Sequence, residues 1–211
     1  MTAGEREHEH GVEDQGSAGY ERAIAFSDGV FAIAITLLVL GLGVPEVADG
    51  ELPDALRDLG PQVTSYFIGF AVIGAFWLGH HRFFGVLRRF DSTLLLLNLA
   101  FLSFISLMPF TTGLLGRYGG VEVAVVAYAA NVIAASAADT AMLWVALRRG
   151  LLAPSHSGDP AARLFASFFP GLVFLCSIPV ALVAPRAAVY TWLALLLGGP
   201  RVLRLWARVR G

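Results

Sequence analysis

The chain has 211 residues, of which 56% are hydrophobic and only 15% are charged. Soluble domains carry about 25% charged residues on average, so this deficit predicts a membrane protein. The formal net charge of -1 gives no indication of nucleic-acid binding. The single cysteine, Cys176, lies in an apolar stretch, which excludes a disulfide framework and a thiolate metal site.

The first 19 residues are polar and acidic and contain no apolar stretch. A secretory signal needs such a stretch behind a basic start, so residues 1–19 are not a signal peptide. Their composition predicts a disordered cytoplasmic tail. His8-Glu9-His10 within it is interpreted as a solvated segment and not as a metal site. Residues 20–211 are then predicted to form one transmembrane domain.

Six segments are long and apolar enough to cross a bilayer, which takes about 20 mostly apolar residues. The predicted spans are about 22–43, 62–81, 92–116, 123–147, 164–185 and 187–205. Pro170 and Pro179 are expected to kink the fifth span, and the sixth is cleanly apolar only as far as Pro200. The predicted fold class is therefore an all-α polytopic membrane protein with six transmembrane helices.

Arginine is distributed unequally between the two sides of the predicted spans, which sets their orientation. The loops on one side carry a single arginine each, at Arg57, Arg117 and Arg186. The arginines on the other side are Arg82, Arg88, Arg89, Arg148, Arg149, Arg163, Arg201, Arg204, Arg208 and Arg210. Both termini are therefore predicted to be cytoplasmic in a multi-pass protein of the cell membrane. The acidic first loop either concentrates cations outside or is simply solvated.

The first span combines a carboxylate, Asp28, with one apolar stripe. At 100° per residue, six side chains fall within an arc of about 80°. They are Arg22, Phe26, Gly29, Ile33, Thr36 and Leu40. Asp28 lies outside this arc and should face a neighbouring helix. The spacing fits ordinary helix packing as well as the wall of a pore, and Gly29 suits both.

The start of this span also carries a motif. Arg22-x-x-x-Phe26-Ser27-Asp28, followed by an apolar helix, resembles the R/K-x-x-x-FSD signature of the transmembrane protein 175 family of potassium channels. The resemblance extends over essentially the whole chain and is greatest to bacterial members with one six-helix unit. It implies a homotetramer in which the first helices surround the ion path. It also implies permeation that favours K+ without a TVGYG loop.

The resemblance assigns roles to three residues of the stripe. It implies that Ile33 forms a hydrophobic pore constriction, that the Thr36 hydroxyl contributes to selectivity, and that Leu40 forms a second apolar ring. Four Ile33 side chains on one axis would act as a dewetting gate. These three residues belong to the stripe that helical pitch selects, so the two arguments agree.

A polar cluster is expected behind the stripe, because an isolated carboxylate in hydrocarbon is destabilising. Ser27 and Asp28 are predicted to bond to Trp77, His80 or Asn98, which lie near the same side of the membrane. The resemblance includes the Trp77-x-x-His80 pair and implies a structural network without direct contact to the ion. His80 is either a satisfied interhelical histidine or a proton sensor.

Two further polar features leave alternatives open. Arg22 is expected to pair with a carboxylate of another subunit or helix at the cytoplasmic mouth. Asp139 and Asn131 share a broad face of the fourth span, where Asp139 makes either a buried structural hydrogen bond or part of a transport relay.

The leading functional prediction is a passive potassium channel. Its predicted partners are K+, other monovalent cations, the lipid bilayer and further copies of the chain, and no cofactor is expected. The alternative is a proton-conducting or proton-coupled transporter with a relay of Asp28, His80 and Asp139. A membrane enzyme is not expected, since the scattered His and Asp residues form no converging nucleophile or metal cluster.

Overall fold

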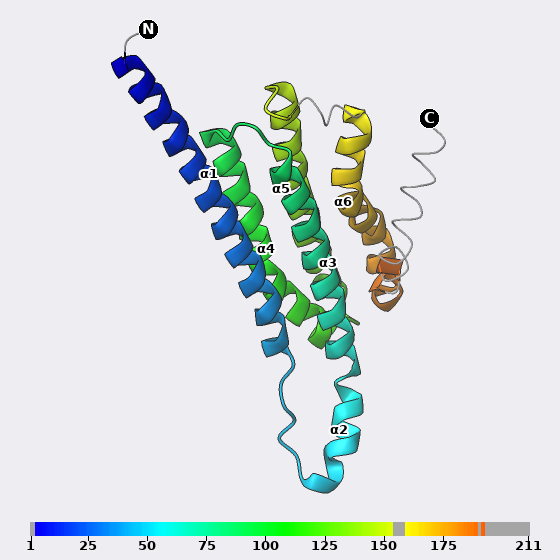
Figure 1. Cartoon of the computed structure of the whole chain (residues 1–211). Coiled ribbons are helices and arrows are strands. Elements are labelled where there is room, and N and C mark those ends of the chain that lie inside the picture. The colour runs from blue at the N-terminus through cyan, green and yellow to red at the C-terminus, as the bar shows by residue number, and fades with distance from the viewer. Residues whose placement is uncertain (1–2, 154–158, 190, 193–211) are drawn as a thin grey trace.

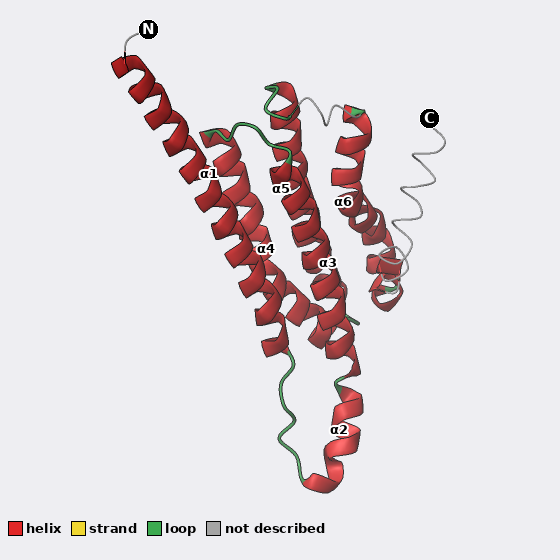
Figure 2. Ribbon diagram, viewed as in Figure 1, coloured by secondary structure: helices red, strands yellow, loops and turns green. Residues whose placement is uncertain are grey.

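The described part of the protein contains five helices that are long and apolar enough to cross a membrane. The computed structural model describes residues 3–153, 159–189 and 191–192, and these are helical apart from connecting loops and one isolated β-bridge (Figure 2). The spans are Gly19–Gly41, Gly60–Gly85, Ser92–Tyr118, Glu122–Arg148 and Pro160–Val183. They overlap the first five predicted spans, and their ends differ from the predicted ends by at most four residues. Most of the sixth, 187–205, lies outside the described residues.

The helices follow one another as an antiparallel bundle (Figure 1). In chain order the elements are α1 (Ala3–Leu37), η1 (Leu38–Gly41), η2 (Asp49–Glu51), α2 (Leu52–Asp58), α3 (Gly60–Gly85), α4 (Ser92–Tyr118), α5 (Glu122–Arg148) and α6 (Pro160–Val183). The short helix α2 projects beyond the bundle at one end, and the first turns of α1 project at the other. The acidic first loop therefore lies at the end opposite the start of α1.

Helix α1 differs in two respects from the sequence-based prediction. It begins at Ala3, where a disordered tail over residues 1–19 was expected, and it ends at Leu37, before the predicted end at residue 43. Extending an existing helix avoids the cost of a new nucleus, and the added segment contains no proline. At the other end, Gly41, Gly43 and Pro45 disfavour a regular helix, and the last turn tightens to the 3-10 helix η1.

Helix α4 is central to the bundle, because it packs against α1, α3 and α5, while α6 packs against α5. Buried aromatic side chains fill both halves. Phe31 of α1 lies with its ring 5.9 Å from that of Phe101 in α4. In the second half, the Trp192 ring lies 4.7 Å from Phe174 and 5.4 Å from Tyr128. The chain after α6 thus returns to pack against α5 and α6.

Two loops meet at the end of the bundle where α3 and α5 finish. The Asp91 carboxylate caps α4 by accepting the Leu94 N–H at 2.9 Å, and Arg149 donates to its second oxygen at 2.5 Å. The N–H of Leu94 and, less strongly, the Arg149 guanidinium lower the pKa of Asp91 below its usual value. Leu87 and Leu152 form an antiparallel bridge beside this pair.

Helix α6 passes through Pro170 without ending, because α5 supplies a substitute for the disturbed hydrogen bond. The Ser136 hydroxyl donates to the Ser167 carbonyl at 3.2 Å and accepts from the Gly171 N–H at 3.1 Å. It therefore bridges a carbonyl and an amide that pair directly in a regular helix. A Cβ at Gly171 would lie 2.8 Å from the Ser136 side chain, so glycine permits this approach.

A second close approach joins α3 to α4 at Gly116. A Cβ built there would lie 2.5 Å from Ser65 Oγ and 3.1 Å from the Gln62 backbone. One turn earlier, Gly113 of the same helix has no heavy atom within 4 Å of its Cβ position.

Gly116→Ala should therefore destabilise the protein by about 1–3 kcal/mol, since overpacking forces a backbone shift. The measurement is thermal unfolding of the purified protein in detergent, and Gly113→Ala is the matched control. Equal unfolding temperatures for the two variants would contradict the packing of α3 on α4.

Candidate functional site

Helix α1 presents two different faces. The face towards α3 and α4 is buried, and its residues are Ala23, Ser27, Phe31, Ala34 and Leu38. The opposite face is uncovered, and its residues include Arg22, Phe26, Gly29, Ile33, Thr36 and Leu40. Ile33 is 60% exposed and Leu40 is 75% exposed. The stripe selected by helical pitch is thus part of the face of α1 that the other described residues leave uncovered.

Within this stripe, Thr36 is the one hydroxyl. Its Oγ1 donates to backbone carbonyls of its own helix, to Ala32 at 3.0 Å or Ile33 at 2.9 Å. Because the hydroxyl proton is used within the helix, the lone pairs of Oγ1 remain available to a hydrogen-bond donor or a cation on the exposed side. Leu40 stands one turn further on, in η1, and keeps its exposed position although the helix has tightened there.

Behind the stripe, three fully buried polar side chains link α1, α3 and α4. Asn98 Nδ2 donates to Ser27 Oγ at 3.0 Å, and Asn98 Oδ1 lies 2.9 Å from His80 Nε2. Ser27 Oγ in turn donates to the Ala23 carbonyl at 2.8 Å. Since Asn98 Oδ1 can only accept, His80 must carry a proton on Nε2. The hydrogen bonds therefore run in one direction, from His80 through Asn98 and Ser27 to the backbone of α1.

Aromatic rings enclose the His80 imidazole. It stacks on Phe84 with ring centroids 4.2 Å apart and on Phe101 at 5.7 Å, and Phe31 meets it edge-on at 5.5 Å. His80 is only 2% exposed. Phe31 also belongs to the buried face of α1, so the imidazole is held between all three helices. This packing fixes the ring in the orientation that its bond to Asn98 requires.

Asp28 has a separate partner. Its Oδ1 accepts the indole N–H of Trp77 at 3.0 Å, and the Trp77 ring stacks on His81 at 5.6 Å. Asp28 also lines a cavity of about 300 Å³ together with His80 and Tyr20. The structure thus brings together all the residues predicted for the polar cluster, but it sorts them into two groups. Ser27 joins Asn98 and His80, whereas Asp28 joins Trp77.

Arg22 lies on the uncovered face of α1. The ion pairs that the structure records join other side chains, and Arg22 has no carboxylate partner among the described residues. A pair with another subunit stays a prediction.

Asp139 belongs to a different site, between α5 and α6. Its Oδ2 accepts the Ser167 hydroxyl at 2.6 Å, and Ser167 Oγ lies 3.2 Å from Thr140 Oγ1. Asn131 does not join it, since its Nδ2 donates to the Phe104 carbonyl of α4 at 3.1 Å. The hydroxyls around Asp139 were missed in the sequence, because a lone serine or threonine in an apolar helix gives no signal of its partner.

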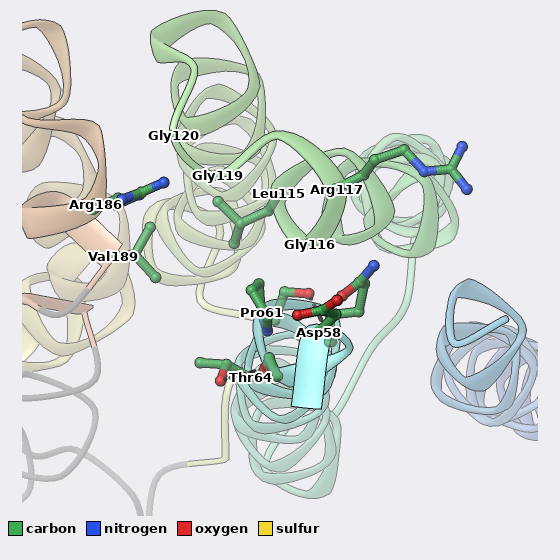
Figure 3. A pocket seen from close by; sticks show the side chains of 13 residues that line it. Asp58, Pro61, Thr64, Leu115, Gly116, Arg117, Gly119, Gly120, Arg186 and Val189 are labelled. Carbon is green, nitrogen blue, oxygen red and sulfur yellow. Dashed lines mark hydrogen bonds between the residues drawn. The ribbon is translucent and has the colours of Figure 1, made fainter. Parts of the chain in front are cut away.

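A pocket of about 520 Å³ opens at the opposite end of the bundle, between the start of α3 and the end of α4 (Figure 3). Asp58 and Thr64 lie on its α3 side, and Arg186 points towards Gly120 on the other side. The Arg117 side chain extends away from it. This pocket was not predicted from the sequence, because its walls come from segments far apart in the chain.

The described part of the chain is a polytopic helical membrane protein whose first span offers an uncovered stripe. The family model described as "Endosomal/lysosomal potassium channel TMEM175" matches residues 22–109, from the signature to the middle of α4. A protein of Streptomyces collinus named as a potassium channel is 39% identical over 147 residues, which cover 67% of this chain and 71% of the relative. The chain belongs to the TMEM175 family.

Other relatives share a shorter region. A protein of Chamaesiphon minutus named as a potassium channel is 42% identical over 100 residues, covering 46% of this chain and 49% of the relative. The mouse protein named endosomal/lysosomal proton channel TMEM175 is 42% identical over 98 residues, covering 42% of this chain and 20% of the mouse protein.

Solved structures share the fold over most of the chain. The crystal structure of the lysosomal potassium-selective channel TMEM175 homologue from Chamaesiphon minutus matches with a TM-score of 0.76 and 27% identity, covering 88% of this chain and 98% of that one. A variant of the potassium channel MtTMEM175 matches with a TM-score of 0.62 and 24% identity, covering 90% and 92%, and shows the fold alone.

Ser27→Ala should destabilise the protein by about 1–3 kcal/mol, because it leaves the buried Asn98 amide without an acceptor. Ser103→Ala is the matched control, since Ser103 is exposed and its hydroxyl bonds only within α4. Thermal unfolding in detergent measures both. A double-mutant cycle with Asn98→Ala should give non-additive effects, and additive effects would contradict the coupling of the two side chains.

Proposed function

We propose that this protein is a potassium channel in which K+ crosses the membrane passively along the uncovered face of α1. One observation carries the proposal: the stripe with Ile33, Thr36 and Leu40 is left exposed by the rest of the chain, although α1 is otherwise packed against α3 and α4. Family membership and the names of the bacterial relatives as potassium channels support it.

Four copies would enclose the ion path, with α1 of each copy facing a common axis. Lipid alone is a poor partner for this face, because Arg22 lies on it near one end and Thr36 near the other. A charged side chain in a span usually faces a partner or a water-filled space. Assembly around an aqueous axis gives both the arginine and the hydroxyl a suitable environment.

Ile33 and Leu40 would form two apolar rings along this axis, and Thr36 would lie between them. An apolar ring that is too narrow for a hydrated ion stops conduction by dewetting, so the Ile33 ring has to widen for K+ to pass. The Thr36 hydroxyl donates within its own helix, which leaves its oxygen to replace part of the ion's hydration shell. Selectivity from four such neutral ligands is modest.

The buried side chains behind the stripe would hold α1 at a fixed rotation without touching the ion. Ser27 and Asp28 turn away from the stripe to partners on α3 and α4. Because the Asp28 carboxylate turns to Trp77 and not to the stripe, the proposed pore has no ring of carboxylates at this position. The channel is not an enzyme in this proposal, and it needs no cofactor beyond the permeant ion.

The start of α1 would be cytoplasmic. The α3–α4 connection and the end of α5, which lie at the same end of the bundle as the start of α1, carry Arg82, Arg88, Arg89, Arg148 and Arg149. Such an excess of arginine is typical of the cytoplasmic side. The proposed location is the cell membrane.

Proton conduction is the second candidate function, because the mouse relative that shares 98 residues with this chain is named as a proton channel. Asp28 and His80 line one cavity beside α1. Asp139 lies between α5 and α6, bonded to Ser167, so a relay through all three groups lacks a contact between its parts.

The decisive experiment measures ion flux from proteoliposomes that contain the purified protein. Separate K+, Na+ and H+ gradients are imposed, with protein-free liposomes as the control. The proposal predicts K+ flux that exceeds Na+ flux. Proton flux without K+ flux would favour the second candidate, and no flux of any ion from correctly assembled protein would exclude both.

Ile33→Asn should raise K+ flux several-fold, since a polar side chain keeps the constriction wet. Leu96→Asn is the matched control, because Leu96 is 67% exposed and belongs to α4, whereas the proposed path runs along α1. Flux from proteoliposomes measures both variants. The gate assignment fails if the two substitutions change K+ flux equally.

Thr36→Ala should lower the K+/Na+ flux ratio by up to about fivefold, the factor that corresponds to about 1 kcal/mol for one lost polar interaction. Thr64→Ala is matched in chemistry, since the Thr64 hydroxyl is also exposed and also bonds back to its own helix, at the Gly60 carbonyl. An unchanged ratio in Thr36→Ala, measured from paired K+ and Na+ gradients, would remove Thr36 from its proposed role.

A further inference from the structure

Backbone contacts gather arginines from two distant parts of the chain at the end of the bundle where α3 and α5 finish. The Arg88 N–H donates to the Leu151 carbonyl at 2.8 Å, and the Ala153 N–H donates to the Val86 carbonyl at 2.9 Å. These bonds flank the bridge between Leu87 and Leu152. The α3–α4 connection is therefore fixed beside the segment that follows α5.

Within the two connecting segments, 82–91 and 148–153, arginines outnumber acids. Segments 82–91 and 148–153 contain a single acid, Asp91. Its carboxylate is used by the Leu94 N–H and by Arg149. Arg88, Arg89 and Arg148 are exposed and have no carboxylate partner among the described residues. Three guanidinium groups are thus left for an external anion.

The position of this surface relative to the bilayer follows from Trp144. Its ring is 48% exposed, one turn before α5 ends, and the Arg148 guanidinium lies over it at 5.1 Å. Exposed tryptophan at the end of a membrane span lies at the level of the lipid headgroups. Stacking on the ring orients the guanidinium and lowers the entropy that Arg148 would lose on binding an anion.

We propose that Arg88, Arg89, Arg148 and Trp144, the arginine–tryptophan surface, bind the phosphate of an anionic phospholipid from the adjacent leaflet. Guanidinium groups pair with phosphate in bidentate fashion, and the negative charge of the leaflet adds to the attraction. The ring of Trp144 would contact the glycerol and upper acyl region. This assignment does not depend on which ion the protein conducts.

The described arginines at the opposite end are Arg57, Arg117 and Arg186, which lie in three separate connections. Arg57 is paired with Asp54. The first loop and α2 there add further acids, which are Glu46, Asp49, Glu51 and Asp58. Anionic lipid should therefore bind preferentially at one end of the protein.

The test compares two triple variants that lose the same charge at opposite ends. Arg88→Gln/Arg89→Gln/Arg148→Gln removes the arginines of the proposed surface, and Arg57→Gln/Arg117→Gln/Arg186→Gln is the matched control. The full-length protein in phosphatidylcholine nanodiscs is titrated with phosphatidylglycerol, and bound lipid is measured by native mass spectrometry. Affinity for phosphatidylglycerol should fall about a hundredfold in the first variant, at roughly fivefold per arginine, and stay near wild type in the control.

Three outcomes would overturn the proposal: equal loss in both triple variants, no loss in either, or equal binding of inorganic phosphate and phosphatidylglycerol to the wild type. If the first triple variant does not fold, Trp144→Leu and Arg148→Gln are tested singly. Each should weaken phosphatidylglycerol binding several-fold relative to Arg117→Gln. Higher salt should weaken binding in the wild type, because it screens exposed charges.

Discussion

The rotation of α1 about its own axis is the constraint on which the rest of the account depends. One residue of slip along an α-helix turns the side chains by 100°. Such a turn would take Ser27 away from Asn98 and would leave a buried amide without its acceptor, which costs about 1–3 kcal/mol. The hydrogen bonds from His80 through Asn98 to Ser27 thus select one rotation, and the aromatic rings around His80 resist any other.

Once this rotation is fixed, the nature of the uncovered face follows. Ser27 and Phe31 face inward, so Ile33 and Thr36 must face outward. The two polar groups of the signature motif have different partners, because Asp28 bonds to Trp77 on the exposed side of α3 while Ser27 is fully buried. Because the Asp28 carboxylate accepts a hydrogen bond from the Trp77 indole, it is directed towards α3 and not towards the proposed ion path. In the proposed channel, the neutral residues of α1 would then contact the ion.

Polar groups inside the apolar bundle are hydrogen-bonded in different ways in the two halves of the chain. Near α1 a side-chain network connects three helices. Between α5 and α6, a side-chain hydroxyl takes the place of a backbone hydrogen bond, as Ser136 does beside Pro170. Asp139 belongs to this second arrangement, which favours its interpretation as a structural hydrogen-bond acceptor for Ser167.

Hydropathy was sufficient to place the first five spans, because bilayer thickness dictates their length. Pitch was sufficient to divide α1 into two faces, since 3.6 residues per turn is a property of the backbone. The members of the polar cluster were predicted, but the choice of Asn98 for Ser27 and of Trp77 for Asp28 was not, because it depends on how α3 and α4 are rotated. Nor were the start of α1 at Ala3 or the bridge between Leu87 and Leu152, which depend on helix extension and on loop packing.

The most direct test of the uncovered face is the pattern of flux block in single-cysteine variants of α1. Cys176 is first replaced by serine, and one cysteine is then introduced at Gly29, Thr36, Ala23 or Ala34. A charged, membrane-impermeant thiol reagent is added to proteoliposomes during K+ flux. Block at Gly29 and Thr36, with none at Ala23 and Ala34, is the result that the account predicts. Block confined to Ala23 and Ala34, or flux that no position affects, would contradict it.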